Sequence, residues 1–153
     1  MDTEKSIDII NSLIEINNDR MEGYETASNE TTDADLKSLF DQLKQTSEHC
    51  KRELVNEVKQ LGGTPFEGTK TTGKLFRVWM DLKAAITNKD HHAILSSCEF
   101  GEDVAVDTYQ EVIENDSNQI TARQLTIIGN QLSLIKSDHE KIRSLRDMAN
   151  ADR

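Results

Sequence analysis

The chain has 153 residues, of which 30% are charged and only 5% aromatic, and it contains a single proline. This composition favours long helices over a sheet-built fold, and the length suits a single domain, residues 1–153, with one continuous core. The net charge of −10 argues against a nucleic-acid partner, because no basic block offsets the repulsion of a phosphate backbone.

Two long segments in the first half of the chain have apolar residues at the 3.6-residue period of a helix. The first runs over about residues 4–29, with Thr3 as its expected N-cap. The second runs over about residues 33–61, with its cap expected within residues 31–33. Gly62-Gly63 then ends the second helix, because glycine is typical of the position after a helix end.

The middle of the chain differs in composition from the two long segments. Residues 62–72 are rich in Gly and Thr and predict an ordered loop. Residues 73–87 predict a shorter amphipathic helix, since Leu75, Trp79 and Leu82 recur at helical spacing.

Two further long helices are predicted in the second half. One starts near residue 88 or 90 and runs to about residue 114, a turn cluster follows at residues 115–118, and the other continues from there to about residue 149. Short loops make the helices within each half antiparallel neighbours, and the long middle stretch can cross the length of the molecule. The sequence therefore predicts an all-α, ferritin-like four-helix bundle of two antiparallel hairpins, joined by a long crossover that contains a short helix.

The location of the protein is predicted from what the sequence lacks. No apolar run approaches the ~20 residues of a membrane-spanning helix. Residues 1–5 lack the basic and apolar regions of a signal peptide. The two cysteines, Cys50 and Cys98, form no Cys-x-x-Cys motif, so we expect a cytoplasmic protein with free thiols.

Polar residues fall on or beside the apolar stripes, and a buried carboxylate without a partner is costly. Glu25 follows Ile14 by eleven residues and Met21 by four, which predicts an inward position. Glu102 lies between Cys98 and Ala105 on its stripe. The candidate metal ligands selected in this way are Glu22, Glu25, His49, Glu99, Glu102 and His139.

These candidates recur in the two halves of the chain. Glu22-Gly23-Tyr24-Glu25 is matched by Glu99-Phe100-Gly101-Glu102, and Ser47-Glu48-His49 is matched by Ser137-Asp138-His139. Glycine inside a helix costs ~1 kcal/mol relative to alanine, so each of the two glycines implies a close helix approach or room for a ligand. The recurrence predicts two hairpins related by a pseudo-twofold axis, with the six candidates meeting near it.

Carboxylates and imidazoles together bind iron, manganese or zinc. Four carboxylates would balance the charge of two divalent cations, so the predicted cofactor is a di-metal centre of iron or manganese. Without metal, four inward carboxylates would repel one another and some would stay protonated.

Five segments carry a resemblance to a known family. These are residues 13–20 with the following Glu22–Glu25 motif, Leu61-Gly62-Gly63, residues 79–85, residues 99–103, and Asp138-His139. With these segments the chain resembles the ferritin-like superfamily, and more closely a bacterial family of ferritin-like bundles whose domain has no assigned function. The resemblance implies the fold and a di-metal site, and it implies no particular reaction.

The chain departs from the usual ferritin-like ligand pattern. Such proteins carry one Glu on the first and third long helices and Glu-x-x-His on the second and fourth. Here Thr46 and Lys136 stand three residues before His49 and His139. The second Glu of each Glu-x-x-Glu motif would then have to replace the missing ligands.

Each candidate also has a simpler interpretation. A Glu-x-x-Glu motif often faces solvent, His139 can be a core histidine, and His49 can pair with a nearby carboxylate. Trp79 and Phe76 either pack the short helix onto the bundle or form a homodimer interface. Two functions follow: a ferritin-like protein that binds metal ions, with iron binding or redox activity, or a non-catalytic interaction or stress-response bundle without metal.

Overall fold

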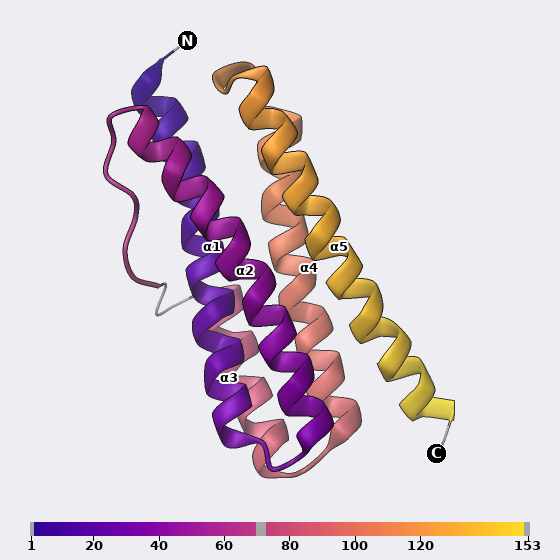
Figure 1. The fold of residues 1–153 in the computed structure, drawn as a ribbon. Coiled ribbons are helices and arrows are strands. Elements are labelled where there is room, and N and C mark those ends of the chain that lie inside the picture. The colour runs from indigo at the N-terminus through magenta and orange to yellow at the C-terminus, as the bar shows by residue number, and fades with distance from the viewer. Residues whose placement is uncertain (1, 70–72, 152–153) are drawn as a thin grey trace.

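A computed structural model describes residues 2–69 and 73–151 of the chain, which form five α-helices, one short 3₁₀-helix and no strand (Figure 1). The α-helices are α1 (Thr3–Glu30), α2 (Ala34–Gln60), α3 (Lys74–Thr87), α4 (His91–Asn115) and α5 (Ala122–Ala151). The 3₁₀-helix η1 (Ser117–Gln119) lies between α4 and α5. The all-α prediction is confirmed. None of the described helices is both long enough and apolar enough to cross a membrane.

Aspartates cap three of the long helices. The carboxylate of Asp2 accepts from the backbone N–H groups of the first turn of α1, and Asp33 and Asp90 do the same for α2 and α4. These bonds satisfy donors that a helix start otherwise leaves unpaired. The expectation that Thr3 caps α1 is wrong by one residue, because Asp2 supplies the accepting oxygen and Thr3 is already helical.

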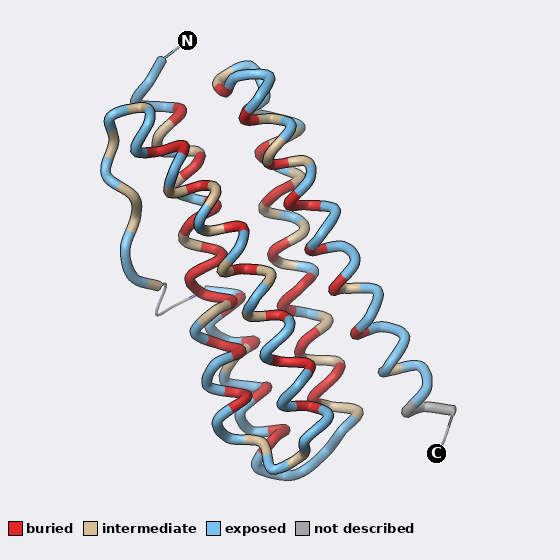
Figure 2. The backbone as a smooth tube through the Cα atoms, viewed as in Figure 1, coloured by how far each residue is buried: buried red, intermediate tan, exposed pale blue. Residues whose placement is uncertain are grey.

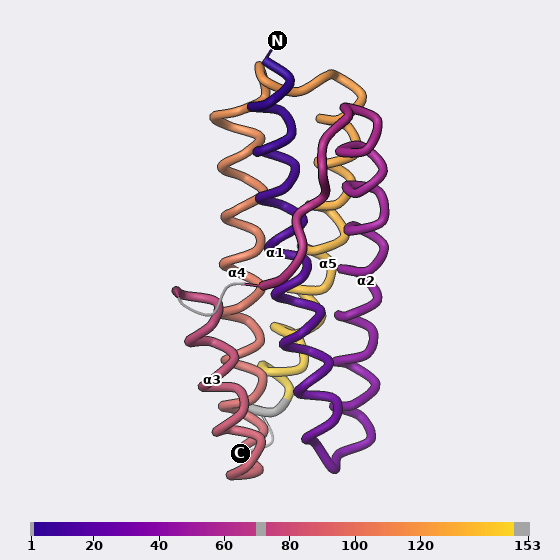
Figure 3. The backbone as a smooth tube through the Cα atoms, turned by 90° about the vertical axis from the view of Figure 1, so that its left-hand side faces the viewer, coloured from indigo at the N-terminus to yellow at the C-terminus, as the bar shows by residue number. Residues whose placement is uncertain are grey.

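The four long helices lie side by side along one direction, and each half of the chain forms a pair of neighbours (Figures 1 and 3). α1 packs against α2 after a short turn at residues 31–33, and α4 packs against α5. The last helix starts later than the sequence predicts, because η1 and the extended, buried Ile120 precede it. Ile120 thereby contributes an apolar side chain to the core from outside a helix.

The connection between the two pairs runs along α1 before it reaches α3 (Figure 3). Asn11 of α1 holds it with two bonds, since its amide nitrogen donates to the carbonyl of Thr64 at 3.1 Å and its oxygen accepts from the N–H of Phe66 at 2.7 Å. Asn18 donates to the carbonyl of Gly68 at 3.0 Å. These bonds fit the prediction of an ordered loop, of which residues 70–72 lie outside the described residues.

Buried residues line the facing sides of the long helices (Figure 2). The apolar ones form two clusters, one that includes Leu13, Leu54 and Ile135 and another that includes Phe40 and Ile142. On every long helix a polar residue falls between the members of the two clusters: Arg20 on α1, Ser47 on α2, Glu102 on α4 and Asp138 on α5. The interior is therefore an apolar core divided by a polar layer.

Candidate functional site

The first Glu-x-x-Glu motif, on α1, faces away from the interior. Glu22 is exposed, and the side chain of Glu25 is 58% exposed, with Oε1 3.8 Å from Nζ of Lys44. The expectation that Glu25 points inward is wrong. The stripe of residues that predicted this position begins at the buried Ile14, but its next member, Met21, is only half-buried. The stripe therefore turns toward the surface before it reaches Glu25.

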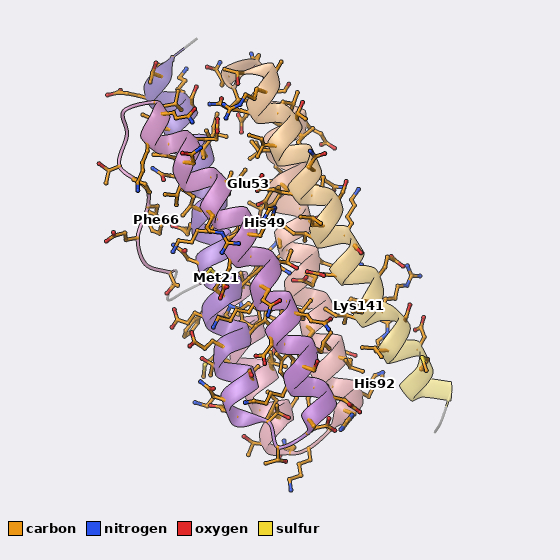
Figure 4. All side chains as sticks on the ribbon, in the orientation of Figure 1. Met21, His49, Glu53, Phe66, His92 and Lys141 are labelled. Carbon is orange, nitrogen blue, oxygen red and sulfur yellow. The ribbon has the colours of Figure 1, made fainter. Side chains whose placement is uncertain are left out.

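His49 is an exposed residue of α2 and lies near the half-buried Glu53 of the same helix (Figure 4). Half of its side chain is exposed, and Nε2 is 3.4 Å from Oε1 of Glu53, one turn further along the same helix. The simpler interpretation, in which His49 pairs with a nearby carboxylate, describes its position.

The second Glu-x-x-Glu motif, on α4, has one carboxylate at the surface edge and one in the interior. Glu99 accepts a hydrogen bond from Arg146 of α5, and its Oε1 is 3.9 Å from Nε2 of His139. The same nitrogen of His139 is 2.7 Å from Oδ1 of Asp103, a carboxylate that the sequence argument did not select. The structure thus brings Glu99 and His139 near each other, at the seam between α4 and α5.

Glu102 is completely buried, and its partner is Arg20 of α1, which is buried to the same degree. Nε of Arg20 donates to Oε2 of Glu102 at 2.9 Å, and Nη2 donates to Oε1 at 2.5 Å. This two-bond pairing matches the planar fork of a guanidinium to a carboxylate. It joins two residues that are 82 positions apart in the sequence and come from different hairpins.

Three further polar groups complete the layer around this pair. The hydroxyl of Tyr24 donates to Oε2 of Glu102 at 3.0 Å, and Nη1 of Arg20 donates to Oγ of Ser47 at 2.7 Å. Oδ2 of Asp138 lies 3.4 Å from Nη2 of Arg20. All four long helices therefore meet at the Arg20 guanidinium. We call these five residues the arginine layer: Arg20, Tyr24, Ser47, Glu102 and Asp138.

The charges in the arginine layer depend on each other. Burial by itself lowers the pKa of Arg20, but the adjacent negative charge of Glu102 and its hydrogen bonds outweigh that effect, so the pKa lies above its usual value and the guanidinium stays charged. Burial raises the pKa of Glu102, while the charge and hydrogen bonds of Arg20 oppose the rise. Because both groups are removed from water, loss of Arg20 would leave Glu102 as an uncompensated buried group. Loss of Glu102 would leave the guanidinium with only the more distant carboxylate of Asp138.

A second set of buried polar groups lies next to the arginine layer and again joins all four long helices. Tyr109 of α4 accepts a hydrogen bond from Asn17 at 2.8 Å and donates one to Oε1 of Gln131 at 2.7 Å. Gln131 donates in turn to the backbone carbonyl of Cys50 and to Glu53, each at 3.1 Å. We call this set the tyrosine layer.

The two buried cysteines are protonated at neutral pH. Burial raises the pKa of the Cys50 thiol to about 11 and raises that of Cys98 further. A thiolate is the form that binds metal or attacks an electrophile. The expectation that both are small buried residues agrees with this environment.

The glycines of the two motifs have a shared structural reason, which is the packing of α3. A Cβ on Gly23 would lie 2.4 Å from ring atoms of Trp79, and a Cβ on Gly101 would lie 3.2 Å from Cγ1 of Val78. α3 thus lies across α1 and α4 at the positions where those helices lack side chains. Trp79 also packs edge-on against Tyr24, with ring centroids 5.1 Å apart, as expected for a helix that packs onto the bundle.

The interior residues do not suit a metal ion. Both oxygens of Glu102 already accept bonds from Arg20, and the guanidinium would repel a second cation at the same place. Within residues 2–69 and 73–151, no group of three or more His, Cys, Asp or Glu side chains is arranged to hold a metal. The six candidate ligands occupy separate settings: Glu22, Glu25 and His49 at the surface, Glu99 and His139 at the α4–α5 seam, and Glu102 in the interior.

The residue that sequence reasoning missed is Arg20, and a signal for it was present. Leu13, Asn17, Arg20, Tyr24 and Ala27 are spaced at i, i+4, i+7, i+11 and i+14, and all are buried. The prediction assigned the inward face of α1 from Ile14 and Met21. A charged residue on that alternative stripe, set against an inward Glu on α4, would have indicated the pair.

Residues 5–115, from the first turn of α1 to the end of α4, match a family described as a domain of unknown function (DUF2383), and the chain belongs to this family. Arg20 and Glu102 fall within the matched residues, whereas Asp138 and His139 on α5 lie beyond them. No curated protein matches the chain. The expected membership of a family whose domain has no assigned function is confirmed.

Proposed function

We propose that this member of the DUF2383 family is a ferritin-like four-helix bundle that works as a non-catalytic binding protein, with Arg20 in the interior place where related folds hold metal. The arrangement of the chain supports the ferritin-like part. Two hairpins are joined by a long connection that follows α1 and then adds α3, which is the one-crossover pattern.

One observation carries the metal-free part of the proposal, the pairing of Arg20 with Glu102. A di-metal centre needs inward carboxylates with free oxygens. Here the inward carboxylate is Glu102, and the guanidinium supplies the positive charge that neutralises it. The Tyr24 hydroxyl donates a further bond to the same carboxylate, so both of its oxygens accept bonds from within the protein.

The non-catalytic part rests on the chemistry of the buried groups. The thiols are protonated because burial raises the pKa of both cysteines. Tyr24 and Tyr109 are fully buried, and burial raises their pKa values well above the usual range. Both phenols already hydrogen-bond to other side chains. These groups stabilise and orient the helices, and they offer no activated nucleophile or base to a substrate.

Thermal unfolding with and without divalent cations tests the proposal. A metal that binds only the folded state at a hundredfold excess over Kd adds ~2.7 kcal/mol. That corresponds to roughly 2–4 °C per kcal/mol for a chain of this size. We expect Fe²⁺, Mn²⁺ and Zn²⁺ to leave the melting temperature unchanged, and purified protein to carry no stoichiometric metal. A rise of several degrees that a chelator reverses would contradict the proposal.

The second candidate function, metal binding, is favoured by one observation, the seam where His139 lies close to the carboxylates of Asp103 and Glu99. An imidazole with carboxylates is a donor set for iron, manganese or zinc. If a cation raises the melting temperature, His139→Ala should remove the rise. Glu25→Gln, which changes a carboxylate remote from that seam, serves as the matched control.

A further inference from the structure

A cavity of about 200 Å³ lies between α1 and α3, beside the crossing where Trp79 packs on Gly23. Its wall on the α3 side is mostly apolar and includes Trp79, Met80 and Ile86, and Lys83 of the same helix also lines it. More than half of Met80 and over a third of Phe76, which also line the cavity, are exposed. A cavity of roughly 150 Å³ lined by apolar groups binds benzene, so this one has room for a ring or a short alkyl chain.

The α1 side of the cavity is acidic. Glu22 and Glu30 line it, and Asp19 contributes to its buried wall. Glu30 lies 3.4 Å from Lys83 and is thereby partly neutralised. Glu22 is exposed and has no ion-pair partner among the described residues, so its charge is free to attract a cation. The net charge of −10 strengthens that attraction over the whole surface.

The aromatic wall suits a cationic ligand with an apolar body. An indole ring attracts an ammonium group placed over its face.

From these observations we propose that the α1–α3 cavity binds a small organic cation with an apolar body, an alkylammonium or arylalkylammonium compound. Its apolar part lies against Trp79 and Met80, and its ammonium group lies at Glu22. This inference rests on the proposed function as a binding protein and names the class of ligand. Glu22 thus has a role that differs from the metal-ligand role predicted from the sequence.

Trp79 is the single tryptophan of the chain, so its fluorescence reports directly on the cavity. The probes are 2-phenylethylamine, the neutral 2-phenylethanol and the anionic 3-phenylpropionate, which share a ring and a short chain and differ in charge. We expect a saturable change with the amine at a Kd at least tenfold lower than with the carboxylate. N-acetyltryptophanamide, titrated in parallel, measures any direct effect of the probes on a free indole.

Two carboxylate variants of α1 distinguish binding in the cavity from a general attraction of cations to the acidic surface. Glu22→Gln should weaken amine binding about fivefold, the effect of one solvent-screened charge at close range, and should leave the binding of 2-phenylethanol unchanged. Glu25→Gln removes the same charge three residues away, outside the cavity lining, and should change neither. Both positions are exposed, and circular dichroism checks that each variant is folded.

The outcomes distinguish the ligand class from the proposed function. Equal or tighter binding of the carboxylate, no saturable response to the amine, or equal effects of the two variants would overturn the ammonium site. In those cases a melting temperature that divalent cations leave unchanged still supports a metal-free bundle. If divalent cations raise the melting temperature and the amine still binds selectively, the proposed metal-free function is wrong, whereas the proposed ammonium site in the cavity stands.

Discussion

The two Glu-x-x-Glu motifs look alike in the sequence and occupy different environments in the fold. On α1, Glu22 and Glu25 are exposed, whereas on α4 Glu102 is fully buried and the side chain of Glu99 is only 16% exposed. The difference arises from the residues that share their helices. On α1 the inward stripe contains Arg20 and Tyr24, and on α4 it contains Cys98 and Glu102.

The comparison teaches that a repeated motif does not imply a symmetric site. If both motifs faced inward, four carboxylates would need metal ions or protons to offset their repulsion. Because α1 presents Arg20 in place of a carboxylate, a cation there pairs with Glu102 and also lies close to Asp138. What the two motifs do share is the glycine, and both glycines serve the packing of α3.

The largest expected effect comes from neutralising the inward carboxylate. Glu102→Gln leaves Arg20 charged and buried with an amide in place of its partner, and we expect a loss of ~3–5 kcal/mol in the free energy of unfolding. The equivalent change on α1, Glu25→Gln, should stay within ~0.5 kcal/mol, because that side chain is 58% exposed. Urea denaturation of both variants measures the difference directly.

A double variant sharpens the same point. Arg20→Met with Glu102→Leu removes both charges of the pair and leaves apolar side chains of similar size, although Asp138 then loses its contact with Arg20. Replacements of this kind at buried ion pairs are often neutral or stabilising, so we expect part of the loss to be recovered. Similar stability losses from Glu102→Gln and Glu25→Gln would show that the two motifs are equivalent after all.

The glycines provide the next comparison, with a smaller effect. In Gly23→Ala the new methyl group would lie 2.4 Å from the Trp79 ring, so α3 must shift, and we expect a loss of ~1–3 kcal/mol. In Gly101→Ala the nearest atom is a methyl of Val78 at 3.2 Å, and the gain of ~1 kcal/mol in helix propensity should offset most of the strain. Melting temperatures test this order, and only Gly23→Ala should alter Trp79 fluorescence strongly.

The smallest expected effect concerns the α4–α5 seam. Glu99→Gln weakens the contacts of Glu99 with Arg146 and His139, which are partly exposed, and should cost about 1 kcal/mol at low ionic strength. Added salt should reduce the difference from the unsubstituted protein, since exposed charges are screened. The loss caused by Glu102→Gln should change little with salt. A salt-insensitive effect at Glu99 would mean that the seam is as protected as the interior.

The helices themselves were predictable because their signals are local. Apolar residues at helical spacing, aspartates at the caps and Gly62-Gly63 after α2 act over a few residues each. The predicted limits differ from the observed ones by a few residues, most of all at the start of α5. There the buried Ile120 continues the apolar pattern of the helix although it lies before the helix begins.

The candidate site was less predictable, because spacing within one helix does not establish which stripe faces the interior. The middle of α1 is buried on several sides, since α2, α3, α4 and the connection all contact it. Ile14 and Leu13 are therefore both buried, and either can be extended into a stripe. One extension leads to the exposed Glu25, and the other leads to Arg20 and Tyr24.

The amino-acid sequence by itself thus determined the helical class, the order of the helices and the existence of charged residues near the core, because propensity, periodicity and capping depend on neighbours in the chain. Only the tertiary structure decided that Glu102 meets Arg20, that Gly23 and Gly101 accommodate α3, and that Glu22 borders a cavity. Each of these depends on how the helices rotate and cross. Rotation and crossing result from the packing of all the helices together, which no single segment encodes.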